Sequence, residues 1–307
     1  MKKLMLIIVA VLIATAVVGV FWGNKRVTAM DLQFNVEDMP AHGITIVSPS
    51  DASFDGLMAI YQQRHPTIPI QELKPLSFFI KNTTSQTVVG YKINLECTKH
   101  DGSVITKSIT DTTLWALTNP EEPGLKASIA KSKTVIKPNG ILFQSLALPP
   151  EALDSSTGKS TLSPLEQKPL TGEIRAAAIE LKTYSRITLK LAGAFLDDGT
   201  FIGADSRYYE QIKAQVDANH NLLREISDGI QSGRSNEEVF SPVAEAANET
   251  EIKLSHQSSP ADLYKYSRRL MAIELMGLKK SKGDDKALER VNKMLSKAWP
   301  NLRRANK

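Results

Sequence analysis

The sequence predicts an antiparallel β-sandwich that is preceded by a membrane-spanning helix and followed by an α-helical region. Three observations carry this prediction. The chain opens with a long apolar run, its middle alternates apolar and polar residues with a period of two, and from residue 205 the period becomes helical. With 307 residues, 42% of them hydrophobic and 23% charged, the composition is that of a globular chain.

The first element is an apolar run from Leu4 to Trp22, which follows two lysines. As an α-helix it would be about 28 Å long, at roughly 1.5 Å per residue, close to the thickness of the hydrocarbon core of a bilayer. Phe21 and Trp22 would lie at the depth of the headgroups, where aromatic side chains are enriched. We therefore expect a membrane anchor over residues 1–24.

Charges on the two sides of this run predict its orientation. The amino terminus with Lys2 and Lys3 carries more positive charge than Lys25 and Arg26, which favours a cytoplasmic amino end. The Met-Lys-Lys leader looks bacterial, so we expect a single-pass protein of the bacterial inner membrane with a periplasmic or extracellular body. The alternative is a signal that is cleaved near Ala29, which would release a secreted body.

A linker over residues 25–42 leads to a predicted sandwich over residues 43–204. In VVGYKINLECT, the apolar side chains from Val89 to Cys97 share one face and the polar side chains share the other, which is typical of a half-buried strand. The segments read as strands are 44–48, 76–81, 88–98, 104–110, 141–148, 173–184 and 186–196. In the last of these we expect Ile187, Leu189, Leu191 and Phe195 on one face.

The connections between these strands favour hairpins over crossover helices. Asp-Gly pairs in KHDGS (99–103) and LDDGT (196–200) predict tight turns, and KNTTSQT (81–87) predicts a polar turn. Two longer connections, 119–140 and 149–172, are rich in Pro, Ser or Gly. Short strands joined by turns predict an antiparallel sandwich.

The helical region is predicted over residues 205–307. A first helix is expected to begin at Asp205 or Ser206 and to end near Gly229 or Gly233. A polar linker with a short helical piece is expected over 232–258. The heptad seam of the first helix consists of Tyr209, Ile212, Val216, Leu223, Ile226 and Ile230, with Asn219 in the gap.

Two further helices follow this linker. Ser259-Pro260-Ala261-Asp262 predicts a capped start, and a third helix is expected from Asp284 to about Trp299. The second helix carries a seam of Leu263, Tyr266, Leu270 and Ile273, and the third carries Leu288, Val291 and Leu295. Such seams pack on each other as a small bundle within one chain, or they bring two chains together.

Two stretches carry a resemblance to a known class of proteins. LDDGTFIGAD (196–205) ends a sandwich in an Asp-Gly hairpin and runs into a long helix, and FFIKNTTSQTVVGYKINL (78–95) is expected to form a hairpin. With the leader, they make the chain similar to uncharacterised exported bacterial proteins that have an immunoglobulin-like sandwich and a helical tail. The resemblance implies an immunoglobulin-like fold and an envelope location, and it carries no catalytic residue.

Catalytic and cofactor motifs in this chain lack residues that their chemistry needs. SSTGKS (155–160) ends like a phosphate loop, but Leu153 stands where the first glycine belongs. DASFDG (51–56) resembles the start of a calcium loop, but Gln62 stands where glutamate belongs. The histidines form no paired metal spacing, and Cys97 is expected in the core. We therefore assign no catalytic residue, cofactor or metal ligand.

The net charge of +5 is concentrated at the carboxyl end, because residues 279–307 hold ten basic and three acidic residues. This basic end is a candidate contact for an anionic membrane or polymer. Nucleic acid is a weaker candidate, because Trp299 is the one aromatic residue among these charges. The candidate contact residues are Lys286, Arg290, Lys293, Lys297, Arg303 and Arg304.

Together these features predict a membrane-tethered, extracytoplasmic binding or assembly module without catalytic activity of its own and with a protein partner. Two alternatives stay open. One is an envelope enzyme of the hydrolase type, with a site in the loops 119–140 and 149–172. The other is a binder of anionic membrane or polymer that acts through the basic carboxyl-terminal helix.

Overall fold

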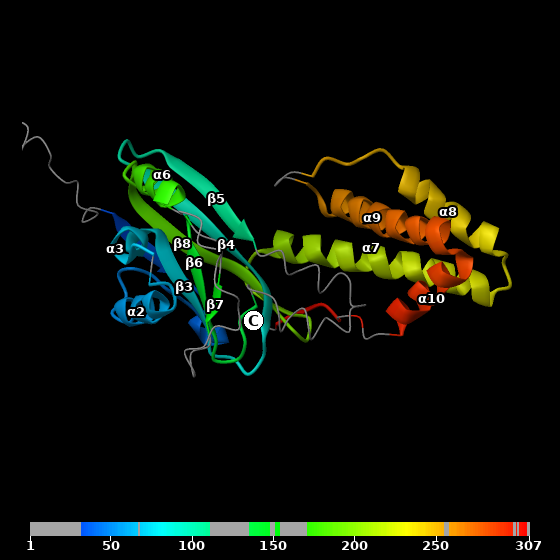
Figure 1. Ribbon diagram of the computed structural model, residues 1–307, viewed down its shortest axis with the longest axis horizontal. Helices are drawn as coiled ribbons and strands as arrows, with labels where there is room; N and C mark the ends of the chain where they lie inside the picture. The colour runs from blue at the N-terminus through cyan, green and yellow to red at the C-terminus, as the bar shows by residue number, and fades with distance from the viewer. Residues whose placement is uncertain are drawn as a thin grey trace, which may run out of the picture.

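The computed structural model describes residues 32–66, 68–110, 135–147, 151–153, 171–254, 258–296, 299 and 301–305. Figure 1 shows a β-rich part beside a helical part, with the long helix α7 leading from one into the other. The predicted anchor over residues 1–24 lies outside the described residues. Within the described ranges, no helix combines the length and the apolar character that crossing a bilayer requires.

The β-rich part contains two sheets. The first has the order β10-β9-β8-β4-β5, with β1 also paired to β8, and the second has the order β2-β3-β6-β7. The pairs β1–β8 and β9–β10 are parallel, and the other pairs are antiparallel. The strands are β1 Gln33–Glu37, β2 Ile44–Val47, β3 Ser77–Asn82, β4 Val88–Lys99, β5 Val104–Thr110, β6 Ile141–Ser145, β7 Glu151–Leu153, β8 Tyr184–Leu196, β9 Thr200–Ile202 and β10 Arg303–Arg304.

The two sheets share one hydrophobic core. Tyr91 and Leu189 of the first sheet belong to the same buried cluster as Phe79 and Phe143 of the second. Gln144 of β6 donates a hydrogen bond through its amide nitrogen to the hydroxyl of Tyr91, so a polar contact also crosses the core. The predicted antiparallel sheets with a following helical region are therefore confirmed.

Helices also occur inside the β-rich part, which the sequence prediction missed. Residues 173–184 were expected to be a strand, but α6 (Thr171–Leu181) occupies most of this range. Ile174, Ala177, Ala178 and Leu181 recur at helical spacing, and Ile174 and Leu181 are buried against the sheets. The other helical elements here are η2 Pro40–His42, α2 Phe54–Arg64, α3 Ile70–Leu73 and η3 Lys74–Leu76.

Two predicted connections also differ from the structure. Residues 78–95 do not form a hairpin, because β3 and β4 belong to different sheets. Asn82 stabilises the segment that passes from β3 to β4. It is fully buried, and its amide nitrogen donates to the carbonyl oxygens of Gln86 (2.8 Å) and Ile136 (2.9 Å). The expected linker over 25–42 contains β1 and η2, because β1 extends the first sheet along β8.

Two β-bulges change the face on which side chains of β4 and β8 lie. The register between these strands shifts at Val89 and again at Ala192. Val89 and Phe195 were expected on the face that carries Tyr91 and Leu189. They instead join a second cluster, because an extra residue in one strand reverses the alternation beyond it.

The helical part begins where this second cluster meets α7. Phe195 and Phe201 pack edge-on against Tyr208 of α7, with ring centroids 5.6 Å and 6.0 Å apart. Asp205 caps α7 by accepting from the backbone nitrogen of Tyr208 (3.0 Å). The helices are α7 Ser206–Gln231, α8 Asn236–Asn248, α9 Pro260–Lys282 and α10 Asp284–Leu295.

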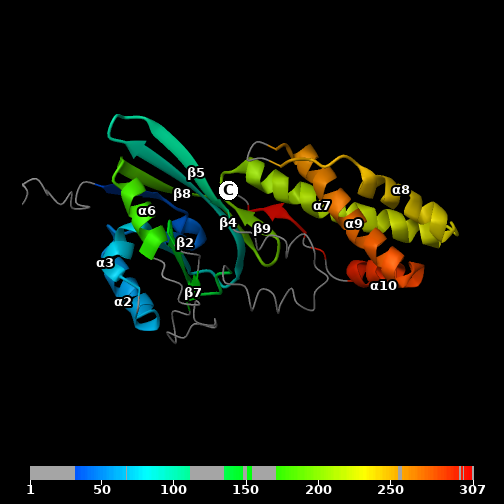
Figure 2. The same cartoon turned by 45° about the horizontal axis from the view of Figure 1, so that its top comes forward.

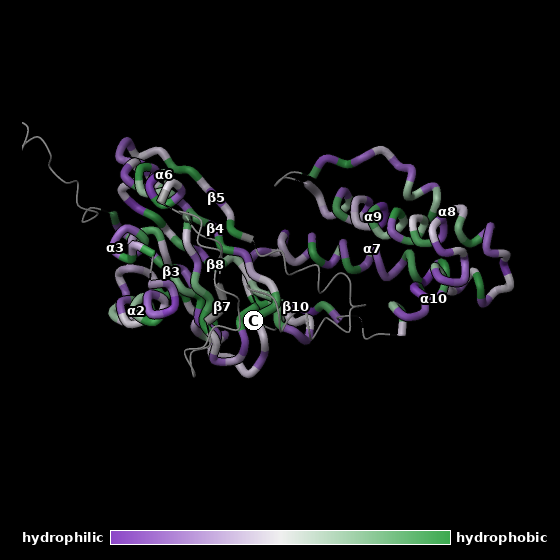
Figure 3. Tube along the Cα trace, in the orientation of Figure 1, coloured by the Kyte–Doolittle hydropathy of each residue, from purple (hydrophilic) through white to green (hydrophobic). Residues whose placement is uncertain are grey.

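The predicted helix starts at Asp205, Ser259 and Asp284 are confirmed, and the short helical piece expected within 232–258 is the helix α8. Ser235 and Glu238 form a capping box at its start, and Val239, Phe240 and Val243 are buried. In Figure 3 the hydropathy alternates along α7 and α9, as expected for helices with one buried face.

The seam expected on α9 is not the buried face of this helix. Leu270 and Ile273 are 45% and 40% exposed, and Leu263 and Tyr266 are partly exposed. The side of α9 that packs in the bundle instead carries Ser267, Met271, Ala272 and Leu275. Met271 and Leu275 supply the large apolar side chains of this buried face, and Leu270 and Ile273 remain outside it.

The described end of the chain returns to the first sheet. β10 pairs with β9, and Tyr209 of α7 donates its hydroxyl to the carbonyl oxygen of Leu302 (3.0 Å). Figure 2 shows β10 beside β9, at the junction of the β-rich and helical parts. The helical part is therefore joined to the sheets at α7 and again at β10.

Candidate functional site

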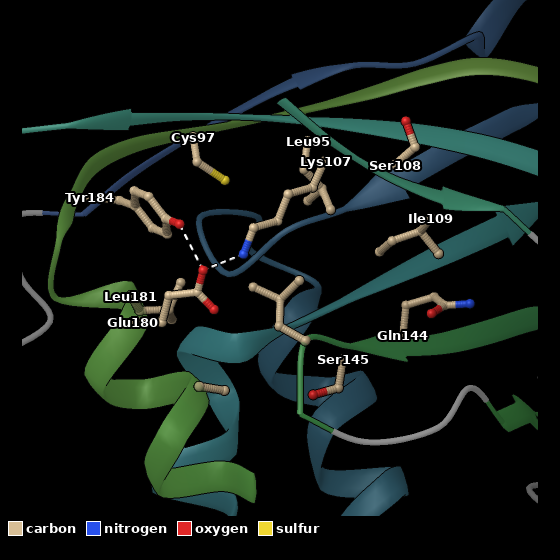
Figure 4. A pocket seen from close by; sticks show the side chains of 12 residues that line it. Leu95, Cys97, Lys107, Ser108, Ile109, Gln144, Ser145, Glu180, Leu181 and Tyr184 are labelled. Atoms are coloured by element: carbon tan, nitrogen blue, oxygen red, sulfur yellow. Dashed lines mark hydrogen bonds and ion pairs between the residues drawn. The ribbon is translucent and has the colours of Figure 1, made fainter. Parts of the chain in front are cut away.

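A cleft of about 340 Å³ opens between the edge of the first sheet, the second sheet and α6 (Figure 4). Its walls are mostly apolar, and charged side chains lie at one end. Its lining includes Leu95, Cys97, Lys107, Ala177, Glu180 and Tyr184. Its volume lies near the lower limit of ligand pockets, about 300 Å³.

Lys107 is the unusual residue of this cleft, because it sits at an inward-facing position of β5. It pairs across the strands with Leu95, whose side chain is buried in the core. β5 is the last strand on its side of the first sheet within the described ranges. An inward charge on an edge strand discourages pairing with further strands, and it also requires a partner.

Glu180 of α6 provides that partner. Its Oε1 accepts a hydrogen bond from the Tyr184 hydroxyl (2.8 Å) and forms an ion pair with the Lys107 ammonium group. The Lys107 Nζ also lies 5.9 Å from the centroid of the Tyr184 ring. Figure 4 shows the three side chains meeting at one end of the cleft.

These contacts fix the protonation states of the three groups. The hydrogen bond from Lys107 lowers the pKa of Glu180, and the same bond raises the pKa of Lys107. Burial, followed by the contact with Glu180, raises the pKa of Tyr184. At neutral pH the cleft therefore presents a carboxylate, an ammonium group and a neutral phenol, none of which is poised to exchange a proton.

Cys97 is one of the residues that line the cleft, and it is 2% exposed. Burial raises the pKa of its thiol, which disfavours the nucleophilic thiolate. With an uncharged thiol, a paired ammonium and a paired carboxylate, the arrangement can bind a ligand by burying apolar surface. Among the lining residues that the structure describes, no activated nucleophile is paired with a base.

The candidate basic residues fall into two groups. Lys286, Arg290 and Lys293 lie on α10, where Lys286 pairs with Glu289 (2.6 Å) and Arg290 pairs with Glu274 (2.5 Å). These three basic residues follow each other at steps of four and three positions, so they share one face of α10.

The second group lies on β10, at the edge of the first sheet. Arg303 pairs with Asp198 (2.5 Å), and Arg304 lies over the ring of Tyr209 (4.8 Å). Lys297 lies outside the described residues. The structure thus assigns acidic or aromatic partners within the chain to several of these cations, which reduces the charge they offer to an anionic surface.

The remaining candidate motifs from the sequence form no functional site within the described residues. Most of the loops 119–140 and 149–172, and the whole of SSTGKS, lie outside the described residues. In DASFDG, the Asp51 carboxylate accepts from the backbone nitrogen of Ser53 (2.7 Å), which is the geometry of an Asx turn. Among the described residues, no three His, Cys, Asp or Glu side chains are grouped to hold a metal ion.

Sequence reasoning did not find the cleft, because it assigned residues 173–184 to a strand. A strand would have placed Glu180 away from the edge of β5. The helical recurrence of Ile174, Ala177 and Leu181 was the signal that could have placed Glu180 on a helix, although not its position beside β5.

Comparisons with family models, with curated proteins and with solved structures found no match. The function of this chain is therefore argued from its own residues.

Proposed function

We propose that this chain is a membrane-tethered, extracytoplasmic binding module without catalytic activity of its own, and that the cleft beside α6 is its ligand site. The observation that carries the proposal is the state of the ionisable groups in the cleft. Lys107, Glu180 and Tyr184 satisfy one another, and the Cys97 thiol is held uncharged. Such a site favours recognition over proton transfer.

The lining favours a small, mainly apolar ligand such as an aliphatic chain. Leu95, Ile109, Leu146 and Leu181 supply apolar surface, whose burial contributes roughly 25 cal/mol per Å². The Lys107–Glu180 pair lies at one end of the cleft, where it can contact the polar head group of a ligand. The apolar part of the same ligand would then lie against the apolar walls. Binding of this kind needs no chemical step.

Support for the tether and the fold comes from different observations. The apolar run from Leu4 to Trp22 supports the anchor, and the bacterial type of leader supports an envelope location. For an immunoglobulin-like relationship, the supporting features are two sheets around one core, the crossing from β3 to β4 and the parallel pairing of β1 with β8.

A cavity-filling pair of variants tests the ligand site. Ala177→Trp places a large ring in the cleft, whereas Ile179→Trp changes a position of the same helix that is 66% exposed. We expect the full chain in lipid nanodiscs to bind n-alkyl alcohols, seen by saturation-transfer NMR. The Ala177→Trp variant should lose this binding, and Ile179→Trp should keep it.

Equal binding by both variants would place the alcohols elsewhere and overturn the assignment of the cleft. Conversion of a bound alcohol into a product would contradict the non-catalytic part of the proposal. Circular dichroism of both variants checks that a loss of binding does not come from a loss of folding.

The tether is tested by the intact mass of the native protein in separated membrane and soluble fractions. We expect a full-length mass in the membrane fraction. A mass that begins near Met30, in the soluble fraction, would replace the anchor with a cleaved signal.

A further inference from the structure

A row of side chains on α9 faces away from the bundle. Tyr266, Leu270, Ile273 and Gly277 follow at steps of four, three and four residues, so they lie on one side of the helix. Leu270 and Ile273 are the largest exposed apolar side chains of α9, and Gly277 has no atom within 4 Å of the position a Cβ would take. We call these four residues the outer stripe.

We propose that the outer stripe is the contact between two copies of this chain, which pair α9 with α9 in the parallel direction. Its spacing is that of the a and d positions of a coiled coil, with Leu270 and Gly277 at a and Tyr266 and Ile273 at d. The contact of this seam with a second α9 would remove the exposed apolar surface from water.

Charge sets the direction of the pair. Arg269 precedes Leu270 and occupies a g position, and Glu274 follows Ile273 and occupies an e position. In a parallel pair, a g residue faces the e residue five positions later in the partner helix, so Arg269 meets Glu274 of the second copy twice by symmetry. In an antiparallel pair, g faces g and e faces e, and this match is lost.

Both side chains flank the outer stripe, and each also has a partner within its own chain. Glu274 is 43% exposed, and Arg290 donates to its Oε1 from two nitrogen atoms. Arg269 is held beside Leu270, because its Nε donates a hydrogen bond to the carbonyl oxygen of Glu249 (2.8 Å). Neither of these two contacts crosses the outer stripe itself.

The seam is short, but α9 is already folded by its own chain. It packs against α7, α8 and α10 through Met271 and Leu275, so pairing does not have to overcome the cost of helix nucleation. A seam of this length gives weak association in solution. Confinement of two copies to one membrane would raise their effective concentration, a point that rests on the proposed tether.

Disulfide trapping tests both the contact and its direction. In a parallel pair, residue 273 faces residue 273 of the second copy, whereas in an antiparallel pair it faces residue 270. We expect the full chain with Ile273→Cys, in nanodiscs under mild oxidation, to form a disulfide-linked dimer. The control variant Ile179→Cys should form about tenfold less of this dimer. Cys97 is 2% exposed and remains in both variants as an internal background.

Addition of Leu270→Glu to the Ile273→Cys variant should abolish the cross-link, because it places two carboxylates in the seam. Equal cross-linking of Ile273→Cys and Ile179→Cys would overturn the proposal. Cross-linking that needs one Leu270→Cys chain and one Ile273→Cys chain would overturn the parallel direction.

A charge exchange provides an independent test. Arg269→Glu alone and Glu274→Arg alone each place like charges across the pair, and each should raise the dissociation constant about tenfold in sedimentation of the full chain. In a mixture of the two variants, every cross-chain pair is again opposite in charge, so mixed dimers should recover the original affinity. If mixing restores nothing, the assignment of Arg269 to Glu274 is wrong. None of these readouts depends on the cleft.

Discussion

At the scale of single residues, the cleft is organised by one inward lysine and the groups that neutralise it. Lys107 would be a costly charge at the edge of a hydrophobic core if Glu180 did not pair with it. Both side chains are nearly half exposed, so water screens the pair and its contribution to stability is modest, about 0.2–1 kcal/mol. The arrangement therefore serves the shape and polarity of the cleft more than the stability of the fold.

The pH dependence of stability should report on this pair. The pKa of Glu180 is lowered from its ordinary 4.5, so its contribution is complete above that value and is lost as the pH falls through the lowered pKa. The pKa of Lys107 is raised from 10.5, so its contribution is lost as the pH rises through the raised pKa. We expect the stability difference between the wild type and Glu180→Gln, from urea unfolding, to be constant near neutral pH and to shrink below about pH 4.5. A difference that stays the same at pH 3 would contradict the pairing.

At the scale of elements, the joint between the sheets and α7 depends on two bulges and close backbone contacts. The bulge at Ala192 turns Phe195 toward Tyr208, and Lys92 pairs with the capping residue Asp205 (2.7 Å). Gly203 has a φ of 137°, and a Cβ there would lie 2.5 Å from the Cα of Gly193. The chain can therefore turn from β9 into α7 only with a glycine at this position.

Gly203→Ala should destabilise the protein by about 2–4 kcal/mol, because the methyl group meets backbone atoms and the φ angle is strained. Gly56→Ala is the matched control: Gly56 lies in α2 with open space around it, and alanine there should stabilise the protein by about 0.5–1 kcal/mol. Urea unfolding of the two variants compares them directly. A similar effect of both changes would show that the joint at Gly203 is not close-packed.

The long central strands and the starts of α7, α9 and α10 could be predicted from the sequence, because alternation and caps are local signals. Apolar and polar residues alternate along most of Val88–Lys99, and the capping residues Ser259 and Asp262 indicate the start of α9. The faces of Val89 and Phe195 could not be predicted, because a bulge is visible only when two strands are paired. The cleft could not be predicted either, because Lys107 and Glu180 are far apart in the sequence and meet only when α6 covers the edge of β5.

At the scale of the whole molecule, the end of the chain ties the helical part back to the sheets. Leu302 packs in the aromatic cluster with Phe201 and Tyr209, and the backbone nitrogen of Ala305 donates to the carbonyl oxygen of Phe201 (2.8 Å). The basic end that the sequence offered as a free surface is therefore partly used inside the molecule. Its net charge could be read from the sequence, but its partners Asp198 and Glu210 could not.

Removal of residues 301–307 should loosen this tie. We expect amides of β9 and of the first turns of α7 to exchange hydrogen faster, because they lose the β10 pairing and the bond from Tyr209 to Leu302. A chain that ends at Ala305 keeps the described contacts and is the control. Unchanged exchange in β9 after the longer deletion would show that β10 contributes nothing to the junction.

The return of β10 to β9 makes the helical part an insertion between two neighbouring strands of one sheet. A load applied to α9 thus reaches the sheet along two separate paths: a covalent one through α7, and a hydrogen-bonded one where β10 pairs with β9. The two connections together restrict rotation of the helical part relative to the sheet more than one connection would. After a single protease cut between β9 and α7, the pairing of β10 with β9 would still hold the helical part to the sheet without a covalent bond.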